Sequence, residues 1–425
     1  MRKMRDSGIE WVGAIPQNWQ LSKIGSLYTQ RNEKVSDKEY QPLSVTMQGI
    51  LPQLATAAKT DDGDNRKLVR VGDFAINSRS DRRGSCGISP LDGSVSLINI
   101  ILTPRTAMHP GYYNWLFHTT LFADEFYKWG HGIVADLWTT RWQEMKSITV
   151  PVPEYAEQER IAAFLDAECA EIDAVLEKTR ASIEEYKKLK QAVITQAVTK
   201  GIRGDRPMKD SGIEWIGDIP KEWDCKKVKY VTSISRGIFN HRPRNDERYY
   251  GGEYPFIQTG DVAGAQKYIE SYSQTLNELG KSVSKCFPKG TLTMTIAANV
   301  GDAAILGFDA FFPDSVVGFI PNADINDEYL YYIFKAMKPE FVRTAIKSTQ
   351  LNLNVERIRD LFVPVVVQKS EQLEIAEYLN TKCADIGALI AKKQQYLTEI
   401  ENYKKSLIYE YVTGKKEVKT SVLAD

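Results

Sequence analysis

DSGIEWVG occupies residues 6–13, and DSGIEWIG returns at residues 210–217. Each copy runs on through Ile-Pro to a second tryptophan, Trp19 and Trp223. Eight residues with one difference do not recur by chance, so the chain contains an internal duplication. This stretch decides the fold, because it marks where each of two equivalent halves begins.

A second pair of matching blocks follows at a distance. EQERIA at residues 157–162 matches EQLEIA at 371–376, and the alignment continues without a gap to Val-Thr at 198–199 and 412–413. Between the paired blocks, residues 20–150 and 224–364 do not resemble each other. A duplicated constant frame with two different inserts predicts one kind of task performed at two sites with different specificities.

The second block of each half opens a long predicted helix. Residues 154–200 contain no Gly or Pro, are rich in good helix formers, and place apolar side chains at heptad spacing. Acidic residues crowd the first half of this helix and lysines the second, which favours antiparallel pairing of the two helices. A plain coiled-coil spacer or dimerisation rod is the alternative. The predicted helix-pairing residues are Leu165, Ile172, Leu176, Ile183, Tyr186, Leu379, Ile386, Ile390, Leu397 and Ile400.

These patterns predict an α+β protein. We expect two mixed α/β domains, each followed by a long α-helix, and the two helices pairing as an antiparallel coiled coil with pseudo-two-fold symmetry. Both inserts should share a fold, with strands at 71–77, 290–296 and 303–308 and aromatic-rich helices at 112–129 and 329–341. The expected divisions are 1–150 (first domain, repeat motif 6–19), 151–200 (first long helix), 201–209 (linker), 210–364 (second domain, repeat motif 210–223), 365–414 (second long helix) and 415–425 (tail).

Composition limits the classes of function. The 425 residues carry 55 basic and 55 acidic side chains, which argues against binding of polyanions by bulk charge alone. No apolar run of 18 residues and no signal segment occur, so we expect a cytoplasmic protein that does not enter a membrane. Five widely spaced cysteines without a CxxC suggest reduced thiols and no metal site. Phosphate-loop, zinc-protease and nucleophile-elbow motifs are missing, so we expect a binding protein with no catalytic residues.

Two predicted loops, at residues 77–85 and 236–245, are rich in arginine. Their guanidinium groups suit bidentate contact with guanine or phosphate. A third, at residues 348–354, alternates amides that could read adenine edges, and its counterpart is 134–141. For any loop taken singly, a solvated turn is the alternative. The DNA-contacting residues predicted from these loops are Ser78, Arg79, Arg82, Arg83, Trp138, Arg141, Arg236, Arg242, Arg244, Gln350, Asn352 and Asn354.

The arrangement of repeats, inserts and helices resembles the specificity subunit of Type I restriction-modification systems. The run YGGEYPFIQTGD at residues 250–261 is similar to a segment of that family's target-recognition domains. Gln258 in this run and Asn299 in a predicted turn complete the DNA-contacting set. The first insert departs from the family segment, and QPLSVTM at residues 41–47 stands in its place.

The resemblance implies a DNA-reading subunit without catalysis of its own. Each target-recognition domain would read one half of a bipartite, asymmetric site in double-stranded DNA, and the helices would set the spacer. The helices would dock two methyltransferase subunits, which use S-adenosylmethionine to methylate adenine N6. Restriction motor-nuclease subunits, with ATP and Mg, would cut unmodified foreign DNA. The alternatives are a coiled-coil scaffold with two protein-recognition domains and, less compatible with the missing motifs, a nuclease in its own right.

Overall fold

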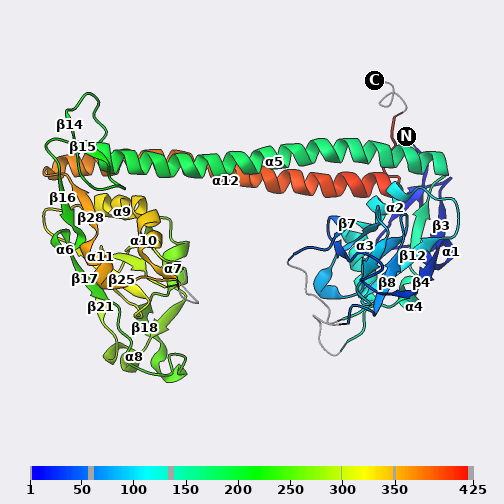
Figure 1. The fold of residues 1–425 in the computed structure, drawn as a ribbon, viewed down its shortest axis with the longest axis horizontal. Helices are drawn as coiled ribbons and strands as arrows, with labels where there is room; N and C mark the ends of the chain where they lie inside the picture. The colour runs from blue at the N-terminus through cyan, green and yellow to red at the C-terminus, as the bar shows by residue number, and fades with distance from the viewer. Residues whose placement is uncertain (1, 56–61, 133–137, 298, 348–350, 420–425) are drawn as a thin grey trace. The chain divides into compact units, whose positions relative to one another are not determined.

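The fold was analysed in a computed structural model, which describes the chain except residues 1, 56–61, 133–137, 298, 348–350 and 420–425. The chain divides into two compact units (Figure 1). Unit 1 combines Met1–Arg180 with Gln395–Asp425, and unit 2 is Ala181–Gln394. Both ends of the chain therefore belong to unit 1, and the division falls inside both long helices, where the sequence had suggested separate helical segments.

Unit 1 is built around a four-stranded antiparallel sheet in the order β10-β9-β12-β4. Unit 1 also contains a three-stranded sheet, β11-β8-β5, and the hairpin β6-β7. Two short strand pairs, β1-β2 and β3-β13, are present as well. Its strands are β1 Met4–Asp6, β2 Ala14–Pro16, β3 Gln20–Lys23, β4 Tyr28–Arg31, β5 Lys34–Val35, β6 Leu43–Thr46, β7 Gly49–Pro52, β8 Arg66–Val69, β9 Phe74–Asn77, β10 Cys86–Ile88, β11 Gly93–Val95, β12 Asn99–Pro104 and β13 Thr149–Val152. Its short helices are α1 Ile24–Leu27, η1 Ser80–Arg82, α2 Pro110–Phe117, α3 Thr120–Lys128 and α4 Trp142–Met145.

Unit 2 is built around a five-stranded sheet in the order β17-β25-β22-β23-β19 and a four-stranded sheet, β20-β18-β24-β21. Its strands are β14 Met208–Asp210, β15 Asp218–Pro220, β16 Asp224–Lys227, β17 Thr232–Arg236, β18 Tyr250–Phe256, β19 Tyr268–Ile269, β20 Gln274–Leu276, β21 Cys286–Phe287, β22 Leu292–Thr295, β23 Ala303–Leu306, β24 Ala310–Phe311, β25 Val316–Pro321, β26 Ile346–Lys347, β27 Leu351–Asn352 and β28 Phe362–Val365. Its short helices are α6 Val228–Val231, η3 Glu247–Tyr249, α7 Thr259–Gly264, α8 Glu278–Ser282, α9 Asp327–Ala336, α10 Lys338–Thr344 and α11 Val355–Asp360.

The two inserts share a core topology, as the sequence predicted. Strands β4, β12, β9 and β10 of unit 1 follow the same pairing order as β17, β25, β22 and β23 of unit 2. The outer strands differ, because unit 1 carries the β6-β7 hairpin where unit 2 carries the long strand β18. A common core with different outer strands is the arrangement expected for one scaffold that presents two different surfaces.

The expected strands are present, but each expected aromatic helix is two helices. In unit 1 the break falls at Thr119, whose hydroxyl accepts a hydrogen bond from the backbone N–H of Phe122 and caps α3. In unit 2 Pro339 lies in the first turn of α10. Proline has no backbone N–H and disrupts a helix interior, so α9 ends before it and a new helix begins. The prediction of single helices at 112–129 and 329–341 was therefore wrong.

The long helices are α5, Tyr155–Lys200, and α12, Lys369–Val412. Within unit 1 the rings of Phe164 and Tyr411 lie 4.4 Å apart, and Asp173 and Lys404 form an ion pair of 2.7 Å. Moving forward along α5 moves the contact backward along α12, so the helices run antiparallel there. Within unit 2, Lys393 of α12 lies over the ring of Tyr186 of α5, and Leu379 joins the core that also contains Ile194.

The predicted seam residues occupy the less exposed positions of both helices. Leu165, Leu176, Ile183, Leu379 and Ile386 are buried, and Ile172, Tyr186, Ile390, Leu397 and Ile400 are partly buried. The mixed α+β class and the long helices are confirmed. The pseudo-two-fold relation remains a prediction. None of the helices in the described part of the chain is long and apolar enough to span a bilayer.

A glycine ends each long helix where the repeated block packs against it. Gly414 has φ 70° and Gly201 has φ 77°, the left-handed conformation that favours glycine at a helix C-terminus. A Cβ at Gly414 would lie 2.5 Å from the Pro16 ring, and one at Gly201 would lie 3.3 Å from Trp223. In unit 1 this contact joins the two ends of the chain, whereas in unit 2 it joins neighbouring segments.

Candidate nucleic-acid interface

The repeated sequence blocks hold the base of each insert. In unit 1 the carboxylate of Glu157 accepts a hydrogen bond from the indole N–H of Trp19 at 2.9 Å and pairs with Arg2 at 2.6 Å. In unit 2 Glu371 pairs with Arg206, whose guanidinium lies 5.8 Å from the ring centre of Trp223. In each unit, the glutamate of the second repeated block thus contacts the tryptophan that follows the first block, or an arginine packed on that tryptophan.

The glutamine after each of these glutamates ties a long helix to an aromatic helix of the insert. The side chain of Gln158 accepts from the backbone N–H of His109, the residue before α2, at 2.9 Å. Gln372 accepts from the backbone N–H of Asn326, the residue before α9, at 2.7 Å. Both glutamines are buried. The same contact therefore attaches each insert to its long helix, and the two inserts differ in their loops.

In unit 1 the guanidinium-rich loop follows β9 and contains η1. Arg82 is 70% exposed at its side chain and lies 3.9 Å from Asp81, which pairs more closely with Arg79 at 3.1 Å. Arg83 pairs with Asp124 of α3. Arg82 is therefore the arginine of this loop with the weakest internal partner, and it retains most of its capacity to bind an external group.

Ser78 has a hydrogen-bond partner inside unit 1. Its side chain is buried, and its hydroxyl donates to the backbone carbonyl of Ile98 at 2.5 Å. The hydroxyl is thus used inside the unit, and contact of Ser78 with DNA stays a prediction. Ser78 anchors the start of the loop.

The structure brings part of the second predicted segment of unit 1 to this loop. The backbone N–H of Ser80 donates to the carbonyl of Trp138 at 2.9 Å, and that of Thr140 donates to the carbonyl of Ser78 at 3.0 Å. The Trp138 side chain is 40% exposed. Arg141 is exposed and precedes α4. An exposed aromatic ring beside exposed guanidinium groups is a combination that suits nucleic acid.

In unit 2 the predicted arginines gather around Asp314. Arg236 donates to the backbone carbonyl of Asp314, Arg244 pairs with its carboxylate, and Arg242 lies 3.5 Å from that carboxylate. Arg242 also donates to the carbonyl of Phe239 at 2.7 Å. Two guanidinium groups share the carboxylate and a third binds the backbone carbonyl of the same residue, so these contacts bring three positive charges to one negative charge.

The predicted amide groups of unit 2 do not form one set. Gln258 donates to the side chain of Gln274 at 2.8 Å, and Asn354 caps α11 by accepting from the N–H of Glu356 at 2.9 Å. Asn299 is exposed between β22 and β23. Asn352 ends β27, and Gln350 lies outside the described residues. Asn354 and Gln258 thus have structural partners, and their contact with DNA stays an untested prediction.

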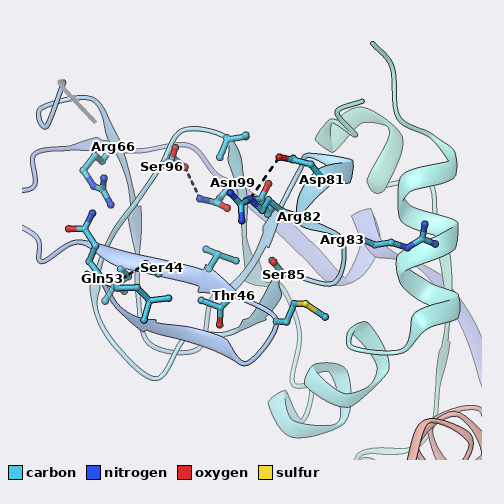
Figure 2. A pocket seen from close by; sticks show the side chains of 16 residues that line it. Ser44, Thr46, Gln53, Arg66, Asp81, Arg82, Arg83, Ser85, Ser96 and Asn99 are labelled. Carbon is cyan, nitrogen blue, oxygen red and sulfur yellow. Dashed lines mark hydrogen bonds and ion pairs between the residues drawn. The ribbon is translucent and has the colours of Figure 1, made fainter. Parts of the chain in front are cut away.

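Sequence reasoning missed a pocket of about 490 Å³ in unit 1. Figure 2 shows it between the β6-β7 hairpin and the loop of Arg82, with Arg66 and Asn99 at its wall and Arg83 pointing away. The only sequence signal was the stretch at residues 41–47, which replaces the family segment and forms β6. Arg66 gave no signal, because an arginine at the start of a short strand looks like an ordinary surface residue.

Comparison with known proteins places these features in context. Residues 220–401 match the family model of the Type I restriction modification DNA specificity domain. The MjaIX specificity subunit of a Type I restriction enzyme from Methanocaldococcus jannaschii is 34% identical over 172 residues, which cover 39% of each chain. The putative MjaX specificity subunit of the same organism is 24% identical over 65% of this chain and 61% of its own. These alignments span about two fifths to three fifths of the relatives' lengths.

Solved structures show a related fold. A chain of a type I restriction-modification complex superimposes with a TM-score of 0.74 at 14% identity, covering 95% of this chain and 99% of its own. The HsdS subunit from Thermoanaerobacter tengcongensis gives a TM-score of 0.50 at 16% identity over 95% and 98%. At these identities the likeness concerns the fold, and it confirms the architecture of two mixed domains with long helices.

Proposed function

We propose that this chain reads DNA for a Type I restriction-modification system, as the sequence resemblance implies and as the match of residues 220–401 to the family model of the DNA specificity domain supports. The observation that carries the proposal is the repetition of one core topology in units 1 and 2 with different loops on each. Two similar scaffolds with different surfaces suit a site whose halves differ. Each unit would read one half of a bipartite, asymmetric sequence in double-stranded DNA.

The loops supply the chemistry that such reading needs. In unit 1 the Arg82 guanidinium is exposed, and in unit 2 Arg242 and Arg244 share one carboxylate. Guanidinium forks bind guanine O6 and N7 or phosphate oxygens in pairs of hydrogen bonds. The balanced total charge means that phosphate attraction from this chain alone would be modest, so partners would add to the affinity.

The long helices would connect reading to the partners' reactions. We propose that α5 and α12 set the unread spacer and dock two methyltransferase subunits, with restriction motor-nuclease subunits joining that core. S-adenosylmethionine would be bound by the methyltransferases, and ATP and Mg by the motor-nuclease. This chain would contribute no catalytic residue, and the complex would act in the cytoplasm. The coiled-coil seam within each unit supports the rigid spacing that this role requires.

Methylation mapping tests the proposal. DNA from cells that express this chain with its cognate methyltransferase should carry methyladenine in a split, asymmetric motif, and DNA from cells without the chain should not. Replacing residues 20–150 by the insert of another such chain should change one half of the motif and leave the other. If the methyltransferase binds and is active but no motif depends on this chain, the scaffold function replaces the proposal.

A further inference from the structure

The pocket beneath the β6-β7 hairpin has a buried arginine, Arg66, in its wall. Arg66 is 4% exposed, and none of the carboxylates in the described parts of the chain forms an ion pair with it. Its Nε donates to the hydroxyl of Ser94 and its Nη2 to the Ser94 carbonyl, both at 2.9 Å. These acceptors are neutral, and the carboxylate of Asp37 favours the positive charge only from beyond ion-pair distance.

Burying a charge without a partner is costly, and natural proteins rarely retain it without a reason. Burial lowers the pKa of Arg66, and Asp37 only partly opposes this effect from a distance. The neighbouring Lys67 is also partly buried, and burial lowers its pKa while its ammonium donates to the backbone carbonyl of Asn99 at 2.7 Å. Arg66 in the pocket wall and Lys67 next to it in β8 are thus both hydrogen-bonded to neutral acceptors.

Asp81, which lies 3.9 Å from Arg82, is the carboxylate in the pocket lining, and two groups of the lining keep free donor capacity. The third guanidinium nitrogen of Arg66, Nη1, has no hydrogen-bond partner among the described residues, and neither does the hydroxyl of Ser85. Arg82 stands at the opposite wall with its guanidinium largely exposed. Figure 2 shows these side chains reaching the pocket from three different elements, β8, η1 and the segment before β10.

We propose that this pocket binds one phosphate group, held by Arg66 and Arg82 with the Ser85 hydroxyl as a further donor. Two guanidinium groups and a hydroxyl match the tetrahedral, acceptor-only oxygens of phosphate. Resting on the proposed function, we assign this phosphate to the backbone of the half-site that unit 1 reads. The bound phosphate would fix the register of unit 1 on the duplex and carry no sequence information itself.

The test replaces single DNA phosphates by neutral methylphosphonates. The full chain, purified with its co-expressed methyltransferase, is titrated onto duplexes that carry the mapped motif with one substituted position each. One position in the unit 1 half-site should weaken wild-type binding by roughly tenfold, and Arg66→Gln should bind roughly tenfold more weakly while losing sensitivity to that position. Equal sensitivity of the wild type and the variant would overturn the assignment.

Two further measurements separate phosphate contact from base reading. A lost phosphate contact lowers the dependence of log K on log salt by about one and leaves the methylation motif unchanged. A motif relaxed at one base by Arg66→Gln would overturn the proposal in favour of base contact. Arg82→Gln, an exposed substitution that should not disturb folding, should show the same two effects. Arg70→Gln is the matched control. Arg70 directly follows β8, the strand that begins at Arg66, but it pairs with Asp92 outside the pocket.

A third measurement keeps the pocket separate from the proposed function. Inorganic phosphate, at constant ionic strength against chloride, should raise the melting temperature of the wild-type chain and not that of Arg66→Gln. If no split motif exists but this stabilisation occurs, the proposed function fails and the phosphate pocket stands. If phosphate has equal effects on both proteins, the pocket proposal fails. If phosphate binds but no methylphosphonate position matters, the assignment to the DNA backbone is wrong.

Discussion

Glu371 lies where the two repeated blocks of unit 2 meet. Its side chain is 4% exposed, and its two oxygens accept from the guanidinium of Arg206, which is 13% exposed. Removing one member of a buried ion pair leaves the other charged and without a partner, so the loss exceeds the net value of the pair. The repetition of this glutamate in the sequence therefore has a structural cause.

Glu371→Ala should destabilise unit 2 by roughly 2 kcal/mol, because Arg206 loses its buried partner and keeps only the more exposed Glu222. Chemical denaturation monitored by hydrogen exchange of unit 2 amides would measure this. Glu374→Ala is the control, since Glu374 lies one turn further along α12 and pairs with the exposed Arg203. Comparable losses in both variants would contradict the assigned importance of burial.

His118 should make unit 1 sensitive to mild acid. Burial lowers the pKa of its imidazole below the ordinary 6.5, and hydrogen bonds to the Asn114 and Cys86 backbones oppose this only partly. The unfolded chain then binds the proton more tightly than the folded one, so this stability is complete above pH 6.5 and declines as the pH falls below it. His118→Gln should reduce the loss of melting temperature between pH 7.5 and 5.5, whereas substitution of the exposed His131 should not. An unchanged pH profile would refute this.

Single residues were the hardest features to predict. Arg82 and Trp138 were predicted from their side-chain chemistry and are exposed in the structure, and their contact with DNA stays a prediction. Ser78 and Asn354 look equally suitable in the sequence, but the structure uses one inside the core and the other to cap a helix. Arg66 was missed because its burial depends on tertiary packing, which local sequence does not encode.

At the scale of elements, the long helices were the easiest to predict. Their heptad spacing extends over more than forty residues, so many positions agree on one face. Short elements gave weaker signals. The β6-β7 hairpin has four residues per strand and was not recognised, and the helix breaks at Thr119 and Pro339 lay within apolar patterns that looked continuous.

Substitutions in the long helices should lower the free energy of unfolding strongly only where the replaced side chain is buried. Leu379→Ala should cost roughly 3 kcal/mol, because Leu379 is fully buried in the core of unit 2 and its removal leaves a cavity. Leu389→Ala, on the same helix at 44% exposure, should cost less than about 0.5 kcal/mol. Urea denaturation of both variants provides the comparison. A large effect at Leu389 would show that its surface is covered in solution.

At the scale of the whole molecule, each unit takes its helical layer from both long helices. Unit 1 contains residues from both ends of the chain, and Leu407 and Val412 of α12 are buried in its core. The hydroxyl of Tyr112 donates to the carbonyl of Val412 at 2.8 Å, and that of Tyr409 to the carbonyl of Val12 at 3.0 Å. The duplication predicted two equivalent halves that follow each other in the sequence. It did not predict that the end of α12 belongs to unit 1.

Deleting residues 395–425 should therefore damage the unit that contains the N-terminus. Hydrogen exchange should show lost protection in residues 1–180, because the core around Trp19 and Tyr112 loses its partners from α12, while amides of the β22-β23-β25 sheet stay protected. A chain ended after Lys419 keeps every described contact and serves as the control. Loss of protection confined to residues 181–394 would contradict the division into units.

The joining of both chain ends in unit 1 also sets an order of events during translation. Residues 181–394 form unit 2 and are all synthesised before the last part of α12. Unit 1 must wait for Leu407 and Val412, although most of its residues were synthesised first. A ribosome that stops early would thus release a chain with all residues of unit 2 and an incomplete unit 1.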